Sequence, residues 1–399
     1  MKNGERTAEN RLSTFRKNDS ISFQRFLSST SASMTPELLY RRLEFRDVEA
    51  EHFKEILDRA TLEHTIIAGQ HGSAEIEQLH GPAFSLDLGR YAFPVVARGQ
   101  FAPGSICIGI AQGERVPTWI NGSSTGRGDL QLYYEGAEIF YRAGPAAHWA
   151  GLTVTRERLQ AEARKRLGRE LPLSSPGVME HVHIDPKAFD RLMRLIGSLR
   201  PRPFGISPSC GAETYSELVL SAYVEAIATA NPSSANAIQR RVAHRYEVVR
   251  RADAAMRGLI GTAYSSPQFC KGLGMSERSL ELYFREALGV SPKAWFQCLC
   301  LHHARMMLRR NGAGRRRVTE VALACGFEHF GRFSEGYREL FGERPSETIL
   351  SSEFAAEAVP KPRQLEYKQQ KSSRGSNYTH SSSCSLNELR DHYSEKVLK

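Results

Sequence analysis

One structural pattern is written twice between Pro267 and Pro345, and it constrains the fold of this chain more than any other feature. The first copy covers residues 269–292 and the second covers residues 321–345. Each copy predicts a short helix, a turn that contains glycine, and a second helix with apolar residues three and four positions apart. Two helices joined by such a turn are typical of a helix-turn-helix. The chain is therefore expected to carry two of these units in tandem.

In the first copy, Leu280, Phe284 and Leu288 recur at four-residue steps and predict the buried stripe of the second helix. Ser276 is expected to cap that helix by accepting a hydrogen bond from a backbone N–H. The outward stripe is a candidate DNA contact because an α-helix fits the major groove of B-DNA. The candidate DNA-binding residues of this unit are Ser276, Arg278, Ser279, Glu281, Leu282 and Arg285.

The second copy repeats the pattern with a shift of 52 residues in its first helix and 53 in its second, so its turn holds one extra residue. Phe333, Tyr337 and Leu340 take the inner positions. The outer face differs in sequence from that of the first unit, which favours recognition of different bases. The candidate DNA-binding residues here are His329, Arg332, Ser334, Glu335 and Arg338.

A long helix that begins at Pro292 and runs to about Arg310 is expected to join the two units. Roughly twenty residues at about 1.5 Å each give a rod of about 30 Å. That length is close to the roughly 34 Å of one turn of DNA, so the two units would meet successive major grooves on one face. The loop after the helix carries three further candidates for phosphate contact, Arg315, Arg316 and Arg317.

The positive charge of the chain is concentrated on this segment. The whole sequence has a net charge of +10, and residues 239–351 hold 19 Lys and Arg against 11 Asp and Glu. Residues 1–238 are close to neutral. This asymmetry favours a polyanionic partner for the duplicated helices.

The segment before the repeat predicts a different architecture. Short apolar runs separated by Gly, Pro and Asn fill residues 63–154, which is typical of a small antiparallel barrel or sandwich. Helical patterns follow over 155–167, 186–198 and 212–230. The last two helices could pack within the chain or form a dimer seam. Residues 1–33 are expected to be a disordered leader and 352–399 a disordered Ser-rich tail, around an N-terminal domain at 34–235 and a helical domain at 239–351.

Residues 255–350 resemble the DNA-binding domain of the AraC/XylS family of bacterial transcription regulators. The matching phrases are GMSERSL at 274–280, GVSP at 289–292, VTEVA at 318–322, CGFEHFGRF at 325–333, and YR and FGERPS at 337–338 and 341–346. The chain departs from that family at Leu282, where many relatives carry a polar base-contacting residue.

The resemblance implies an α+β chain, with an N-terminal cupin-like antiparallel β-barrel and flanking helices, and then an all-α domain of two helix-turn-helix units joined by a long helix. It implies promoter binding as a homodimer, usually activation by contact with RNA polymerase, and sensing or dimerisation by the first domain. It does not identify a small-molecule effector.

Other function classes have little support in the sequence. No nucleophile motif is present, and the seven cysteines form no CxxC pair. The early histidines lack the close spacing of a metal-binding cupin, so no cofactor, metal or catalytic residue is expected. With no membrane-length apolar run and no secretory signal, the expected location is the cytoplasm. Two alternatives stay open: an enzymatic metal-cupin domain attached to the DNA-binding domain, and a non-specific architectural DNA binder.

Overall fold

A computed structural model describes residues 38–45, 60–68, 73–112, 118–199, 212–230, 237–310, 318–355 and 365–367 of the chain. The expected leader lies outside these residues, and so does the stretch 231–234, whose Asn-Pro-Ser-Ser sequence predicts a linker. None of the described helices combines the length and the apolar character that a membrane crossing needs.

The N-terminal domain consists of two antiparallel sheets. The larger sheet has the strand order β12-β9-β6-β11-β4-β3-β1-β13 and the smaller has the order β2-β5-β10-β7-β8. The strands are β1 (Leu39–Phe45), β2 (Ala60–Ile66), β3 (Ala74–His80), β4 (Ser85–Tyr91), β5 (Val95–Phe101), β6 (Ile106–Gln112), β7 (Thr118–Ile120), β8 (Ser123–Thr125), β9 (Asp129–Tyr133), β10 (Glu138–Ala143), β11 (Ala147–Val154), β12 (Met179–His183) and β13 (Leu365–Tyr367).

The expectation of many short strands is confirmed, and the expected closed barrel is corrected to two facing sheets. Closure requires the edge strands to pair with one another. Within the described residues, the edge strands of each sheet pair on one side only, so each sheet keeps its own edges. The apolar core between the sheets is what holds them together, with residues such as Ile76, Val95 and Tyr141.

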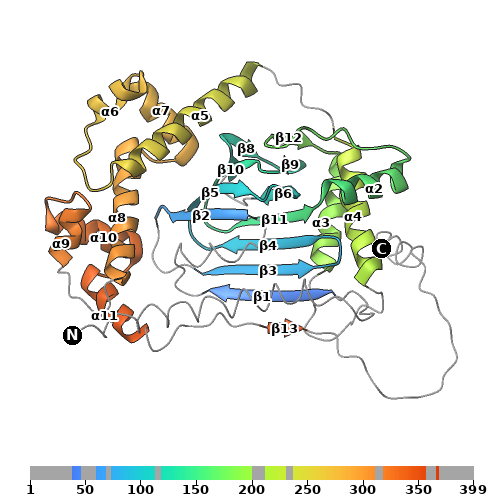
Figure 1. The fold of residues 1–399 in the computed structure, drawn as a ribbon, viewed down its shortest axis with the longest axis horizontal. Helices are drawn as coiled ribbons and strands as arrows, with labels where there is room; N and C mark the ends of the chain where they lie inside the picture. Colours follow the sequence, from blue (N-terminus) through green and yellow to red (C-terminus); the bar gives the residue numbers. More distant parts are fainter. Residues whose placement is uncertain are drawn as a thin grey trace, which may run out of the picture. The chain divides into compact units, whose positions relative to one another are not determined.

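Strand alternation gives the larger sheet two different faces. On β9, Leu130 and Leu132 pack into one cluster with the flanking helices, while Tyr133 belongs to the cluster between the sheets. The flanking helices are α2 (Arg156–Leu167), α3 (Pro186–Ser198) and α4 (Ala212–Ala228), and α3 and α4 are seen beside the strands (Figure 1).

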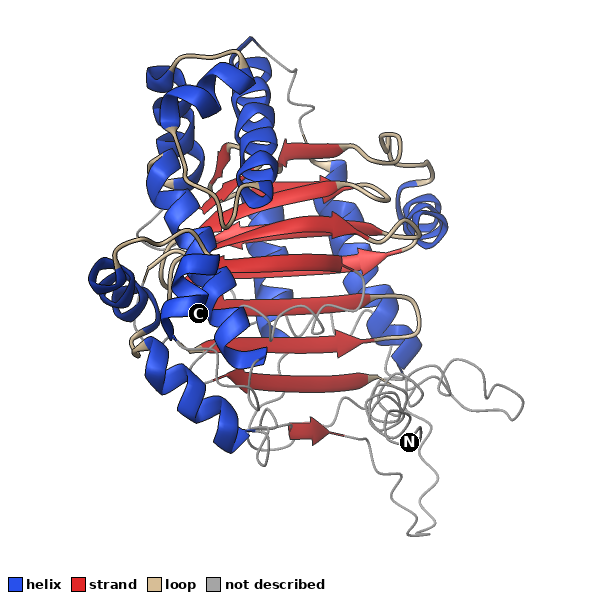
Figure 2. Cartoon of the chain, turned by 60° about the vertical axis from the view of Figure 1, so that its left-hand side comes forward, coloured by secondary structure: helices blue, strands red, loops and turns tan. Residues whose placement is uncertain are grey.

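The apolar stripes of α3 and α4 are used within this chain. Leu192 and Ile196 of α3 and Leu220 and Tyr223 of α4 are at most 4% exposed, and they join the same cluster as the larger sheet. Figure 2 shows the strands of that sheet side by side, with helices against one face. Of the two interpretations left open by the sequence, packing within the chain is the one that the structure shows for these side chains.

The C-terminal domain is entirely helical in the residues described up to Ala355. It contains α5 (Ala237–Gly258), α6 (Ser266–Leu273), α7 (Glu277–Leu288), α8 (Pro292–Arg310), α9 (Val318–Ala324), α10 (Phe330–Phe341) and α11 (Pro345–Ala355). The expected disordered tail from 352 does not describe all of that segment, because α11 continues to Ala355 and β13 pairs with β1. The rest of the tail lies outside the described residues.

Candidate nucleic-acid interface

The first unit consists of α6 and α7. The Ser276 hydroxyl accepts a hydrogen bond from the Ser279 backbone N–H at 3.2 Å, so the expected cap is confirmed. Gly289 ends α7 at a φ of 78°, a left-handed conformation that glycine adopts without steric cost. Leu280, Phe284 and Leu288 are all within 1% of full burial, which confirms the expected inner stripe. This packing fixes the opposite face of α7 outward.

The outward face of α7 carries the predicted candidates, but they are not equally available. Arg278 is exposed, and Leu282 keeps 47% of its surface. Arg285 donates to the Glu281 carboxylate at 2.7 Å, so these two side chains act as a pair. The four-residue spacing of Glu281 and Arg285 was the sequence signal for this pairing.

The second unit consists of α9 and α10. Phe333, Tyr337 and Leu340 are buried, as their spacing predicts. Arg332, Glu335 and Arg338 are exposed, and Ser334 is half-buried. His329 occupies the N-cap of α10 without a side-chain capping hydrogen bond, which leaves its imidazole at the exposed start of the helix.

One outward residue of α10 was missed by the sequence reasoning. Phe330, the first residue of the helix, keeps 40% of its surface. Phe330 receives no role from the sequence pattern, because the helical spacing identifies only Phe333 and Tyr337 as the inner aromatic residues. Phe333 takes the inner position, so Phe330 presents an apolar ring at the exposed start of α10.

The long helix α8 joins the two units and contributes to both cores. Its 19 residues span about 28 Å at 1.5 Å per residue. Trp295 and Leu299 pack with the first unit, while Leu301, Ala304 and Leu308 pack with the second. Because one helix is buried in both clusters, the separation of the units is fixed by α8.

The predicted phosphate-contact loop falls in a gap of the structure. Arg315, Arg316 and Arg317 lie outside the described residues, so their placement is not tested.

A network of charged side chains connects α5 with the smaller sheet. The Asp253 carboxylate is 1% exposed, and it accepts hydrogen bonds from Arg98 of β5 at 2.7 Å and from the Trp295 indole N–H at 2.8 Å. Arg257 bonds both Asp253 and Glu63, at 3.1 and 2.7 Å. These contacts lower the pKa of Glu63 despite its burial, because two guanidinium groups face its carboxylate. Sequence reasoning did not predict this network, since its members are far apart along the chain.

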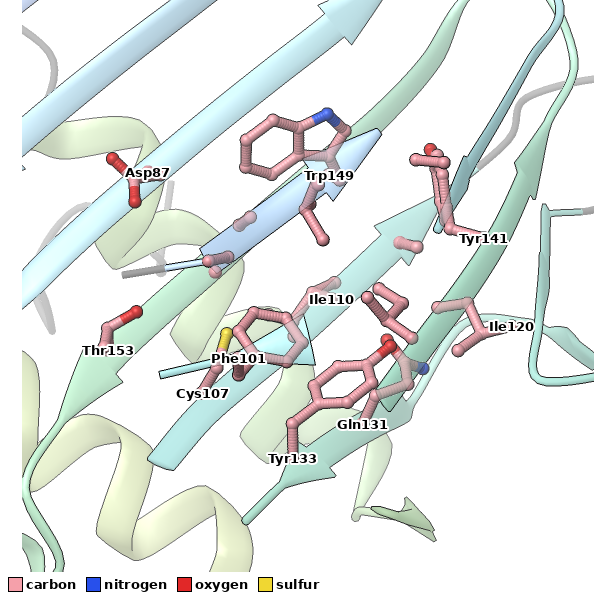
Figure 3. Close-up of a pocket in the computed structure, with 18 of the residues that line it drawn as sticks. Asp87, Phe101, Cys107, Ile110, Ile120, Gln131, Tyr133, Tyr141, Trp149 and Thr153 are labelled. Carbon is pink, nitrogen blue, oxygen red and sulfur yellow. The ribbon is translucent and has the colours of Figure 1, made fainter. Parts of the chain in front are cut away.

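A cavity of about 90 Å³ lies between the two sheets (Figure 3). Its lining includes residues from both, such as His64, Phe101, Gln131, Tyr133 and Trp149. The sequence identified none of these residues as a binding site. Among the described residues there is no group of three or more His, Cys, Asp or Glu side chains that could hold a metal ion.

These features define a class of protein: a two-sheet domain joined to a DNA-binding domain with two helix-turn-helix units. Residues 269–350 match the family described as "Helix-turn-helix domain". The chain is 44% identical over 75 residues to the "XylDLEGF operon transcriptional activator" of Pseudomonas putida, which is 19% of this chain and 23% of that protein. It is 36% identical over 87 residues, 22% of this chain and 26% of the other, to the "Probable thc operon regulatory protein" of Rhodococcus erythropolis.

A solved structure of a probable AraC family transcriptional regulator from Rhodopseudomonas palustris is 32% identical, over 27% of this chain and 97% of that one, with a TM-score of 0.26. The C-terminal domain of the chain is similar to the DNA-binding part of these regulators, in agreement with the resemblance to the AraC/XylS family seen in the sequence. The match spans about a quarter of the length of the curated relatives. The proteins named here are transcriptional regulators and not enzymes.

Proposed function

We propose that this chain is a sequence-specific transcriptional regulator, most directly an activator, that inserts α7 and α10 into two successive major grooves. The observation that carries the proposal is that two outward helix faces are joined by one helix, α8, which is about 28 Å long and packs into the cores of both units. The activating role is supported by the names of the Pseudomonas putida relatives.

The proposed contacts differ between the two helices. On α7, Arg278 and the exposed Leu282 are the base-contacting residues, with the Leu282 side chain suited to a thymine methyl group. Arg285 is hydrogen-bonded to Glu281, and we assign it to a phosphate contact rather than to the recognition of a base. Ser276 and Ser279 supply hydroxyls at the N-terminus of the helix.

On α10, Arg332 and Arg338 are the cationic contacts, and Phe330 offers a second apolar contact to a base edge. Ser334, Glu335 and His329 border them. Arg315, Arg316 and Arg317 contact phosphates in this proposal, because their three charges precede the second unit directly.

The two-sheet domain serves in this proposal as a cupin-like sensing and dimerisation domain. The smaller sheet supports this role because its two faces have different neighbours. On β5, Phe101 faces the cavity, while Val96 and Arg98 contact the helical domain. A ligand between the sheets would therefore touch β5, the strand whose Arg98 donates a hydrogen bond to Asp253 of α5. The regulator acts in the cytoplasm as a homodimer and contacts RNA polymerase at its promoters.

Genome-wide mapping of the sites occupied by the chain tests the proposal. The expected result is a set of narrow peaks at promoters that share one sequence motif, with lower transcription of the adjacent genes in a deletion strain. Broad occupancy without a motif would instead identify a non-specific architectural DNA binder. Occupancy at promoters with raised transcription in the deletion strain would show a repressor.

A further inference from the structure

We propose that the cavity between the two sheets binds a compact, uncharged, mainly apolar molecule that carries one hydrogen-bonding group, and that it rejects carboxylates of the same size. Its role as a regulatory ligand depends on the proposed function, whereas the binding itself does not. The argument uses the polar atoms of the cavity, its charges and its size.

Gln131 is the polar centre of the cavity. Its side chain is fully buried, and neither its amide oxygen nor its amide nitrogen has a hydrogen-bond partner in the structure. Tyr133, two residues along β9 and on the same face, is 2% exposed and its hydroxyl also lacks a partner. Figure 3 shows both side chains at the cavity. Buried polar atoms without partners are rare in folded proteins and are costly, so such a group calls for an explanation.

A bound molecule accounts for these atoms. A glutamine amide presents one acceptor and two donors, and a tyrosine hydroxyl presents one donor and acceptor sites. A ligand group that both donates and accepts, such as a primary amide or a hydroxyl, would pair with the Gln131 amide from either side. The specificity of such a contact is high because an unsuitable ligand leaves the buried amide unpaired.

The charges of the cavity exclude an anion. Its described lining contains no Lys or Arg. Burial lowers the pKa of His64 to about 3, so this imidazole is neutral at pH 7. The carboxylate of Asp87 also faces the cavity, where it would repel a second carboxylate. A buried anion without a cationic partner is strongly disfavoured.

Asp87 does not turn the cavity into a cation site by itself, because its carboxylate accepts a hydrogen bond from the Gln78 amide at 3.0 Å. The rest of the lining is dominated by apolar and aromatic side chains, among them Leu62, Phe101 and Ile120. A volume of about 90 Å³ exceeds the roughly 10–15 Å³ that one water needs. The site therefore suits one small organic molecule with a single ring.

Isothermal titration calorimetry of the full-length chain with three probes of one size tests the proposal. The probes are benzamide, benzoate and benzylammonium, which share a ring and differ in the charge of the polar group. We expect benzamide to bind at least tenfold more tightly than either charged probe. Equal or tighter binding of benzoate or of benzylammonium would overturn the ligand class, and the absence of heat with all three would overturn the site.

Three variants connect the binding to the named atoms. Gln131→Leu should weaken benzamide binding at least tenfold and should raise the melting temperature of the ligand-free chain, because it removes two buried unpaired polar atoms. Tyr133→Phe deletes only the hydroxyl and should weaken benzamide binding severalfold. Gln100→Leu is the matched control: its exposed amide donates to the Gly136 carbonyl outside the cavity, so benzamide affinity should not change. If Gln131→Leu binds benzamide normally, the assignment fails.

Binding to promoter DNA is measured separately on the same preparations. A chain that binds benzamide but no promoter sequence would refute the proposed function and support the ligand class. A chain that binds its promoters but none of the probes would support the proposed function and refute the ligand site.

Discussion

Single side chains decide what the two helix-turn-helix units present to DNA. The inner stripes of α7 and α10 are buried in the same manner, but Arg278 and Leu282 stand where the second unit has Gly331 and Glu335. Spacing predicted the inner residues correctly, because burial follows a helical period. The four-residue spacing of Glu281 and Arg285 is compatible with their pairing, whereas spacing did not show that Phe330, at the start of α10, faces outward.

Arg332 is expected to contribute directly to specific binding. We expect Arg332→Ala to weaken promoter binding by about 1–3 kcal/mol if the guanidinium reads a base. Titrations by fluorescence anisotropy with the cognate and a scrambled duplex would measure this loss. Arg164→Ala, which removes an exposed arginine of α2 paired with Glu170, is the control and should leave both affinities unchanged. Unchanged cognate affinity for Arg332→Ala would refute the contact.

His302 is expected to make folding stability depend on pH. Its ring N–H donates to the Ile66 carbonyl at 2.9 Å, and burial lowers its pKa to about 4. Since the folded pKa lies below the unfolded value, this contribution is complete above about pH 6.5 and is lost as the pH falls toward 4.

We expect His302→Gln, which keeps a donor but does not titrate, to flatten the fall in unfolding free energy between pH 6.5 and 4. The change should be about 1 kcal/mol per pH unit, below the 1.4 limit because the residue is only partly buried. Urea denaturation at pH 7, 6 and 5 would measure it. Parallel pH profiles of the variant and the parent chain would contradict the assignment.

At the scale of elements, the smaller sheet contacts both the cavity and the helical domain, through its two opposite faces. On β5 and β10, alternate residues face the cavity and the helical domain: Tyr141 lines the cavity, and Phe140 packs with Val249 and Trp295. The sequence predicted the strands but not which face meets which partner. Both faces are apolar, so a period of two residues does not distinguish them. For the same reason the strand pattern did not decide between a barrel and a sandwich, and it left the role of α3 and α4 undecided.

Asp253 is expected to be the most sensitive residue between these elements. Asp253→Asn keeps the shape but removes the charge that two guanidinium groups share, so Arg98 and Arg257 lose a buried partner. We expect a loss of about 3 kcal/mol in unfolding free energy, the low end for a broken buried pair because both arginines are partly exposed. Urea denaturation would measure it.

The matched control is Glu286→Gln, which breaks the half-exposed pair with Arg245 in the same domain. A pair on the surface contributes about 0–1 kcal/mol, so this variant should stay close to the parent chain. Equal losses in the two variants would show that burial of Asp253 has no special role.

For the molecule as a whole, the sequence predicted the two helix-turn-helix units better than it predicted the two-sheet domain. The repeat made the helix ends predictable, since Gly289 and Gly342 end α7 and α10 in the same left-handed conformation. The cavity had no such signature. Gln131 and Tyr133 of the larger sheet become neighbours of His64 of the smaller sheet only after the two sheets stack, and no local pattern encodes that arrangement.

The fixed length of α8 leads to a prediction about the spacing of the DNA site. If α8, a rod of about 28 Å, holds α7 and α10 at a fixed separation, both units contact DNA only when their base groups are about one helical turn apart. Inserting 5 base pairs between the two contacted segments rotates one of them by about half a turn. We expect this insertion to weaken binding about 100-fold, which corresponds to about 2.8 kcal/mol.

An insertion of 10 base pairs separates a rigid connection from a flexible one. It restores the face of the duplex but doubles the distance between the segments to about 68 Å, which a 19-residue helix cannot span. The two insertions should therefore weaken binding to a similar extent, measured by gel shift with duplexes of equal length. Recovery of affinity with 10 base pairs would mean that the two units move independently. It would refute the role of α8 as a rigid connection that sets the distance between the two units.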